Sequence, residues 1–219
     1  MSSGIWAVVP VKPFELAKTR LSAALSGSER AQLARAMAED VLEKLAGTRL
    51  LAGVMVVTAD AAAAALAKQY GAVVLREAAP TGIDAALARA TRYLSSTPQA
   101  GMLVVASDLP QVSCAAIDEL TRIVNATNPA VAIVPATRDR GTNVLGCLPA
   151  TIIAPSFGPR SFDRHYLAAR IDGLEPVVLE SSVLGYDIDR PGDLATFLSL
   201  GTSTRTHAFL SRVAMQAAS

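Results

Sequence analysis

Cysteine is scarce in this chain, which has only two among its 219 residues. Cys114 and Cys147 are too few for a disulfide framework and lack the spacing of metal ligands. We therefore expect both thiols to lie in the core of a protein that works in a reducing cytoplasm.

Neither a strong net charge nor a long apolar run is present. The net charge of +1 gives no electrostatic footprint for nucleic acid or for an anionic membrane surface. The longest apolar stretches have the length of strands and are interrupted by glycine, proline or charge, so no transmembrane span is expected. The N-terminus lacks the basic start and cleavage site of a signal peptide. Nucleic acid and membrane are therefore not predicted as partners.

Apolar residues, in contrast, are abundant. With 51% hydrophobic and 18% charged residues, the chain has the composition of a globular protein with a large core. No internal repeat, low-complexity tract or interdomain linker is evident, which favours a single domain over residues 1–219 with a core at about 5–200. The tail, 201–219, is either a docking helix or disordered. The oligomeric state stays open, and a homodimer is compatible with the sequence.

Short apolar runs alternate with helical patterns, which is typical of βαβ units and predicts a mainly parallel sheet flanked by helices. The predicted strands are Ile5–Val9, Val54–Thr58, Ala72–Leu75, Met102–Ala106, Ala130–Val134 and Pro176–Leu179.

Helices are predicted from caps and from apolar residues at helical spacing. The first has Ser28 as its N-cap and ends at Gly47. Between Val134 and Pro176 the pattern breaks into loops. The remaining predicted helices are Asp60–Tyr70, Ile83–Leu94, one that follows Ser113 as its cap, and one that has Pro191 in its first turn.

Three carboxylates lie where strands of the predicted sheet are expected to end. Asp108 follows the run Met102–Ala106, and Asp187 and Asp189 leave an extended backbone on the same face. Hard oxygen ligands suit Mg²⁺, and open α/β folds bind ligands at this edge, so a magnesium–nucleotide site is predicted. The alternative is structural: Asp108 caps a helix, and the other two form a turn before Pro191.

A basic loop follows the first predicted strand. Lys12, Lys18 and Arg20 offer point charges and a forked donor for phosphates. The loop contains neither a Walker motif nor G-x-G-x-x-G, which excludes a P-loop and a dinucleotide fingerprint. The alternative is a solvated basic loop.

Two polar loops, Arg138–Asn143 and Phe157–Phe162, carry the remaining chemistry. Thr142 and Ser161 offer hydroxyls, Arg160 offers a forked cation, and Gly158 lets the backbone approach a ligand closely. An acidic small molecule would fit there. The alternative is two surface turns.

Together these stretches resemble a known family. The motifs PVKPFELAKTRL, SDLP, RGTNVL, FGPRSF and YDIDRPGDL, in this order and spacing, are similar to those of the 2-phospho-L-lactate guanylyltransferases. The family includes phosphoenolpyruvate and 3-phosphoglycerate guanylyltransferases and acts in the biosynthesis of the deazaflavin coenzyme. The resemblance implies an α/β nucleotidyltransferase fold of the glycosyltransferase-A type, with a Rossmann-like, mainly parallel sheet.

The resemblance also implies roles for individual residues. Asp108, Asp187 and Asp189 would bind Mg²⁺, and the Lys12–Arg20 loop would hold the phosphates of GTP. The phosphorylated acid would be held by Thr142, Gly158 and Ser161. The residues predicted to be catalytic are Asp108, Lys18 and Arg20.

Three residues depart from the family pattern, which commonly has Gly at Ser107, Asn at Asp84 and Gly at Arg160. Asp84, which opens the third helix, is predicted to accept two N–H bonds from guanine, and a helix cap is the alternative. Arg160 either pairs with a carboxylate or phosphate of the acceptor, narrows the pocket, or points to water.

The implied reaction joins GTP to a small phosphorylated three-carbon acid and releases pyrophosphate. A phosphate monoester is largely dianionic at neutral pH, so its attack needs no protein base. His165 is accordingly interpreted as a local hydrogen-bonding residue. The alternatives are a nucleotidyltransferase that uses CTP or another acceptor, and a non-catalytic nucleotide-binding regulatory protein.

Overall fold

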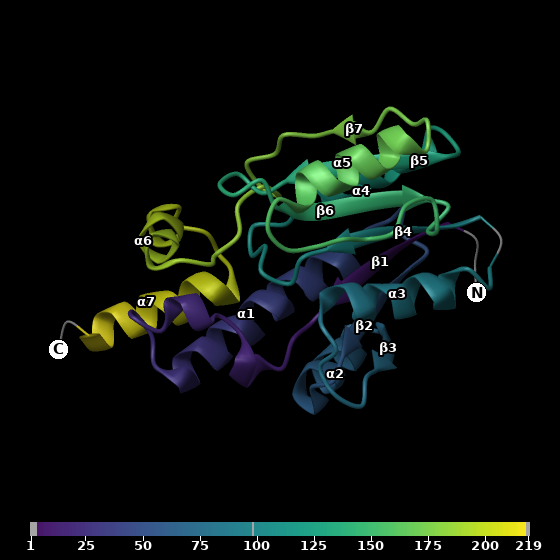
Figure 1. Cartoon of the computed structure of the whole chain (residues 1–219). Coiled ribbons are helices and arrows are strands. Elements are labelled where there is room, and N and C mark those ends of the chain that lie inside the picture. The colour runs from purple at the N-terminus through teal and green to yellow at the C-terminus, as the bar shows by residue number, and fades with distance from the viewer. Residues whose placement is uncertain (1–3, 98, 218–219) are drawn as a thin grey trace.

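The computed structural model describes residues 4–97 and 99–217, and in these ranges seven strands form one mixed sheet (Figure 1). The strand order is β3-β2-β1-β4-β6-β5-β7. The strands are β1 (Gly4–Pro10), β2 (Gly53–Thr58), β3 (Val73–Arg76), β4 (Ala100–Val105), β5 (Ala130–Pro135), β6 (Thr142–Leu148) and β7 (Val177–Val178).

The first half of the sheet is parallel, as the sequence predicts. Strand β1 pairs in parallel with β2 on one side and with β4 on the other. Strand β6 then pairs antiparallel with both β4 and β5. The expectation of loops throughout the region between Val134 and Pro176 is therefore wrong. Strand β6 begins directly after a turn-forming segment. The sequence therefore predicts Thr142 and Asn143 as the end of a loop, although they are the first residues of a strand.

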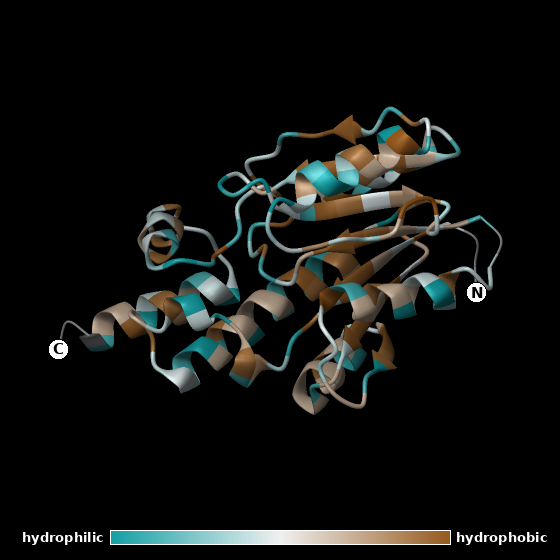
Figure 2. Ribbon diagram, in the orientation of Figure 1, coloured by the Kyte–Doolittle hydropathy of each residue, from teal (hydrophilic) through white to brown (hydrophobic). Residues whose placement is uncertain are grey.

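The central strands are apolar throughout because helices cover both faces of the sheet. Along β1, Ile5, Ala7 and Val9 belong to the hydrophobic cluster on one face, and Trp6 and Val8 belong to the cluster on the other. This alternation follows the two-residue period of a strand. Figure 2 shows the central strands mostly in brown, between helices on which teal and brown segments alternate.

Helices α1 (Gly27–Ala46), α2 (Ala61–Gln69) and α4 (Cys114–Asn125) contribute to the first cluster, and α3 (Ile83–Leu94) and α5 (Ser161–Ile171) to the second. The N-cap of α1 is Ser26, which forms a capping box with Glu29, and not Ser28 as predicted. The reciprocal pair satisfies two backbone N–H groups, which a cap two residues later would leave without partners. The cap Ser113 of α4 is confirmed.

The C-terminal part of the chain forms α6 (Pro191–Ser199) and α7 (Arg205–Ala217). Helix α7 packs beside α1 and α6 packs against α7, away from the sheet (Figure 1). Phe197 of α6 and Phe209 of α7 share a third hydrophobic cluster with Leu21 and Ile188. The tail is therefore a docked helix over its described residues. Carboxylate Asp40 of α1 accepts hydrogen bonds from the backbone N–H groups of Arg205 and Thr206, each at 2.9 Å, and so caps α7.

Both cysteines are unpaired, and Cys147 is buried on β6, where burial raises the pKa of its thiol to about 12. Cys114, at the start of α4, is half-buried, so the expectation of a core thiol holds fully only for Cys147. Across the described ranges, no helix combines the length and the apolar composition that crossing a bilayer requires.

Candidate functional site

The basic loop and Asp108 meet because of the sheet topology. Strands β1 and β4 are parallel neighbours, so their carboxyl ends lie at the same edge. The basic loop leaves β1, and Asp108 follows β4 by three residues. Two residues that are 90 positions apart in the chain, Lys18 and Asp108, are thereby brought into contact.

Lys18 is the centre of this contact. Its side chain is only 7% exposed, and its ammonium donates to the Asp108 carboxylate at 2.6 Å and to the backbone carbonyl of Ile188. The Asp189 carboxylate lies 3.7 Å from the same ammonium. A buried lysine that joins these segments is not the solvated basic residue of the alternative interpretation.

Arg20 and Asp187 complete the cluster. The Arg20 guanidinium donates to Asp189, although the arginine is largely exposed. Burial, and then the negative charge of Asp108, raise the pKa of the Asp187 carboxyl. The cluster contains three carboxylates and two cations, so it carries an excess of negative charge that a bound cation would offset.

The backbone of the basic loop is strained and supported from outside. Lys18 has φ +54° and ψ +37°, in the left-handed region that L residues rarely adopt. The backbone N–H of Phe14 donates to Asp60 at 2.8 Å, so the N-cap of α2 also anchors this loop. Lys12 is exposed near the start of the loop. Two short 3₁₀ turns, η1 (Phe14–Leu16) and η2 (Thr19–Leu21), complete it.

Asp187 and Asp189 lie in a loop and not at the end of a strand, which corrects the sequence-based expectation. The nearest preceding strand, β7, ends at Val178. The loop is placed by side chains from elsewhere: the Asn143 amide donates to the carbonyl of Leu184 at 2.9 Å. A hydrogen bond from a buried side chain of β6, rather than strand pairing, thus holds the loop that places the two carboxylates near Asp108.

Asp193 holds the other end of this loop. Its Oδ2 accepts from the backbone N–H groups of Asp189 and Arg190, at 2.9 and 2.8 Å. The other carboxylate oxygen pairs with Arg138. Asp60 and Asn143 were not predicted as site residues because each contacts backbone far away in the sequence. Asp193 was not predicted either, although its backbone partners are its near neighbours in the sequence. The sequence carries a signal for Asp193 alone: an acidic residue at the third position of the helix that begins at Pro191 is typical of a capping box.

The second half of the site is formed by the Phe157–Phe162 loop beside β6. Thr142 and Ser161 are buried, at the first residues of β6 and α5. The alternative of two surface turns is therefore wrong for both residues. Gly158 has φ +107°, which glycine adopts without strain. Gly158 is exposed, so its backbone is open to the close approach of a ligand that the sequence predicts.

Arg160 is also in the left-handed region, with φ +54°. Its Nε donates to Asp163 at 2.8 Å, and Asp163 is paired with Arg140 as well. Arg140, and then Arg160, lower the pKa of the Asp163 carboxyl to about 2. Arg160 therefore has a protein partner in this structure, and its predicted contact with an acceptor stays a prediction.

Asp84 lies in the first turn of α3 and links the two halves of the site. One of its carboxylate oxygens accepts the backbone N–H of Phe157 at 2.8 Å. The residue is exposed. This bond supports the Phe157–Phe162 loop, a role that neither the guanine contact nor the helix cap anticipated.

His165 lies behind the same loop, fully buried on α5. Its Nδ1 is 3.0 Å from the Thr142 hydroxyl, and its Nε2 accepts the backbone N–H of Ser156 at 2.8 Å. Burial, followed by the charge of Arg164, lowers the pKa of His165 to about 4. It is a local hydrogen-bonding residue, as interpreted from the sequence.

The donor chemistry of the carboxylate cluster fits Mg²⁺. No three His, Cys, Asp or Glu side chains within residues 4–97 and 99–217 are grouped closely enough to hold a metal by themselves. Mg²⁺, however, is usually bound through one or two carboxylates together with substrate phosphates and water. The raised pKa of Asp187 beside Asp108 marks the pair that would gain most from such a cation.

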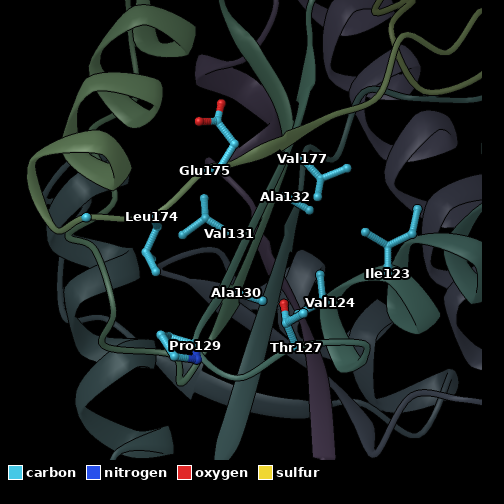
Figure 3. A pocket seen from close by; sticks show the side chains of 11 residues that line it. Ile123, Val124, Thr127, Pro129, Ala130, Val131, Ala132, Leu174, Glu175 and Val177 are labelled. Carbon is cyan, nitrogen blue, oxygen red and sulfur yellow. The ribbon is translucent and has the colours of Figure 1, made fainter.

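A separate cavity of about 220 Å³ lies between α4, β5 and the segment that leads into β7 (Figure 3). Its lining is mostly apolar, with Thr127 and Glu175 as the polar side chains. None of the predicted site residues lines it. We therefore do not assign the nucleotide or the acceptor to this cavity.

The whole arrangement has close parallels among known proteins. Residues 5–218 match the family model described as guanylyl transferase CofC like. The chain belongs to this family. Membership makes it a nucleotidyltransferase of the type that the motifs indicate, and confirms the resemblance stated above.

Two relatives from bacteria illustrate the match. A phosphoenolpyruvate guanylyltransferase from Conexibacter woesei is 34% identical over 200 residues, which cover 91% of this chain and 90% of the relative. A 3-phospho-D-glycerate guanylyltransferase from Phenylobacterium zucineum is 36% identical over 183 residues, 81% of this chain and 82% of the relative.

Solved structures confirm the fold. A protein from Desulfovibrio desulfuricans G20, described as a nucleotide-diphospho-sugar transferase, has a TM-score of 0.78 at 20% identity, covering 96% of this chain and 95% of that one. A CMP:2-keto-3-deoxy-manno-octonic acid synthetase in complex with CTP has a TM-score of 0.61 at 12% identity, covering 91% and 98%. The predicted nucleotidyltransferase fold of the glycosyltransferase-A type is thus correct.

Proposed function

We propose that this chain transfers the guanylyl group of GTP to the phosphate of a small phosphorylated three-carbon acid and releases pyrophosphate, in deazaflavin coenzyme biosynthesis. The observation that carries the proposal is the meeting of Lys18, Asp108, Asp187 and Asp189 at the carboxyl edge of the sheet, beside the loop that Asp84 and His165 support. The names of the relatives favour phosphoenolpyruvate or 3-phosphoglycerate as the acceptor, and 2-phospho-L-lactate is the third candidate.

The acceptor supplies its own nucleophile, since a dianionic phosphate oxygen needs no base to attack the α-phosphorus. The protein's task is to align the reacting groups and to offset their charge. Lys18 and Arg20 release their carboxylate partners and pair with the triphosphate, whose charge is larger than that of one carboxylate. Gly158, Thr142 and Ser161 hold the acid in the facing half of the site.

Mg²⁺ belongs to this proposal, with Asp108, Asp187 and Asp189 as the residues that would hold it. When bound, the ion would neutralise phosphate charge and polarise the α-phosphoryl group. The uncompensated negative charge of the cluster supports the assignment. Lys18, already in contact with Asp108 and Asp189, offsets part of the repulsion between these carboxylates in the absence of substrate.

Pyrophosphate release from a grid of nucleotides and phosphorylated acids tests the proposal. We expect turnover with GTP, Mg²⁺ and at least one of the three acids, and much less with CTP or ATP. A product of the correct mass, guanosine diphosphate-linked acid, must accompany pyrophosphate. Turnover with CTP in preference to GTP would contradict the guanylyl assignment, and stable binding of GTP without turnover of any acid would favour a regulatory protein.

We also propose a cytoplasmic location and self-association. The unpaired thiols are consistent with a reducing compartment. Apolar side chains are exposed on α5 and on the edge strand β7, with Ile171 at 83% exposure and Val177 at 46%. An open apolar edge of this kind favours a second copy of the chain as its partner. Sedimentation of the wild-type protein and of Ile171→Lys tests the homodimer, which the substitution should weaken.

A further inference from the structure

The imidazole of His165 connects two groups that belong to the predicted acceptor half of the site or border it. On one side is the hydroxyl of Thr142, 3.0 Å from Nδ1, and on the other is the backbone N–H of Ser156, 2.8 Å from Nε2. Both His165 and Thr142 are buried, and Thr142 begins β6 at the edge where β4 leads to Asp108. The ring therefore lies directly behind the predicted acceptor residues.

The position of the ring proton follows from this geometry. A backbone N–H can only donate, so Nε2 must present its lone pair to Ser156. A neutral imidazole then carries its proton on Nδ1, and this N–H donates to the Thr142 oxygen. The hydroxyl proton of Thr142 must consequently point away from the ring, toward another acceptor.

The ring is neutral under ordinary conditions because burial and the nearby charge of Arg164 lower its pKa to about 4. A protonated ring would have to donate from Nε2 toward the N–H of Ser156, which cannot accept. The same ring contacts Phe157 edge-on, at 4.9 Å between ring centroids. His165 thus fixes both the loop backbone and the direction of one hydroxyl.

We propose that His165 is a positioning residue that turns the Thr142 hydroxyl proton toward an anionic oxygen of the phosphorylated acid. This inference rests on the proposed function, since it takes Thr142 as an acceptor-binding residue. A hydroxyl that is held as a donor binds an anionic oxygen better than one free to rotate, because no orientation has to be selected on binding. His165 would therefore act on acceptor affinity and not on GTP affinity.

The chain contains an internal contrast for the proton position, since its two histidines are placed in opposite ways. His207 has its Nε2 3.1 Å from the carbonyl of Leu198, which can only accept, so this ring carries its proton on Nε2. Nitrogen NMR of the folded wild-type protein near pH 7 should show one histidine protonated at Nδ1 and the other at Nε2. The His207→Gln variant assigns the signals. A His165 ring protonated at Nε2 would overturn the proposal without reference to any activity.

Two substitutions of similar size separate the two hydrogen bonds. The amide nitrogen of asparagine can take the place of Nδ1 and donate to Thr142, whereas glutamine reaches the place of Nε2 and accepts from Ser156. We expect His165→Gln to raise the acceptor KM by about tenfold, the effect of one lost hydrogen bond, with a GTP KM within about twofold of wild type. His165→Asn should restore most of the acceptor affinity.

Thr142→Val completes a double-mutant cycle. If His165 acts through the Thr142 hydroxyl, His165→Gln has little further effect on the acceptor KM in the Thr142→Val background. Additive effects would overturn the proposal, and so would an unchanged acceptor KM in a folded His165→Gln protein. A wild-type protein that turns over no phosphorylated acid would instead refute the proposed function. These two failures are therefore distinguishable.

Discussion

The ammonium of Lys18 donates to the carboxylate of Asp108 at 2.6 Å, and this bond joins the loop after the first strand to the loop after the fourth. The same ammonium also donates to the backbone carbonyl of Ile188 and lies 3.7 Å from the carboxylate of Asp189. Three distant segments of the chain therefore meet at one nitrogen atom. Under the proposed function, substrate binding would exchange these ion pairs within the protein for ion pairs to phosphate.

Removal of a single carboxylate from the cluster should abolish turnover. We expect Asp108→Ala and Asp189→Ala to lower kcat by at least about 10²-fold, because repulsion between the two phosphate groups would no longer be offset. Steady-state kinetics at varied Mg²⁺ concentration measures the loss. Asp172→Ala, a change of an exposed carboxylate at the end of α5, is the matched control. A folded Asp108→Ala or Asp189→Ala protein with normal turnover would remove these residues from the site.

Lys18 and Arg20 should hold the triphosphate. Lys18→Ala and Arg20→Ala are each expected to weaken GTP binding by about tenfold to a hundredfold, since each removes a charge-assisted hydrogen bond. Calorimetric titration with GTP and Mg²⁺ gives the affinities, and Lys68→Ala on the exposed face of α2 serves as the control. Unchanged GTP affinity in both variants would assign the loop a structural role.

Two different roles of Asp84 predict changes in different kinetic constants, so steady-state kinetics of Asp84→Ala can separate them. A contact with guanine predicts that Asp84→Ala lowers the preference for GTP over CTP and ATP. The observed bond to Phe157 predicts instead a higher acceptor KM, because the Phe157–Phe162 loop loses an anchor. We expect the acceptor effect, of about tenfold, in any case. If the nucleotide preference is unchanged, the predicted guanine contact is wrong.

Arg160→Gly should raise the acceptor KM more than the GTP KM, and it should also stabilise the fold. Glycine removes the left-handed strain at φ +54°, which is worth about 1 kcal/mol and a rise in Tm of about 2–4 °C. Arg140→Gly is the matched control, because it also places glycine at a positive φ, +57°, and removes the other arginine partner of Asp163. Equal acceptor KM values in wild type and Arg160→Gly would leave Arg160 as a surface residue, and Arg160→Lys should restore only part of the affinity.

The buried His165 should make stability fall in mild acid. Its pKa is about 4 in the folded chain, below the ordinary value of 6.5, so the unfolded chain binds a proton first as the pH falls. The free energy of unfolding should therefore decrease between about pH 6.5 and 4, by up to about 3 kcal/mol, and not further through this residue. Urea unfolding of wild type and His165→Gln across this range isolates the effect. Parallel curves for the two proteins would contradict it.

The sequence predicts the parallel half of the sheet well because its strands are buried on both faces and its helices carry clear caps. It fails at β6 and α5, where a strand and a helix start directly at residues that look like parts of loops, Thr142 and Ser161. The predicted site residues Lys18, Arg20, Asp108 and Asp189 come together as expected. The supports Asp60 and Asn143 are not predicted, because contacts with backbone tens of residues away leave no periodic signal. Asp193 contacts nearby backbone, and its place in the first turn after Pro191 indicates a helix cap rather than a site residue.

Leu21, next to Arg20, and Ile188, between the two aspartates, share their hydrophobic cluster with Phe209 and Leu210 of α7. The ribosome makes the chain from its N-terminus, so α7 emerges after the basic loop, the sheet and the aspartate loop. Until then, the basic loop and the aspartate loop lack the apolar surface on which both rest. A nascent chain can therefore fold its sheet early and yet complete the proposed phosphate-binding site only once α7 has docked.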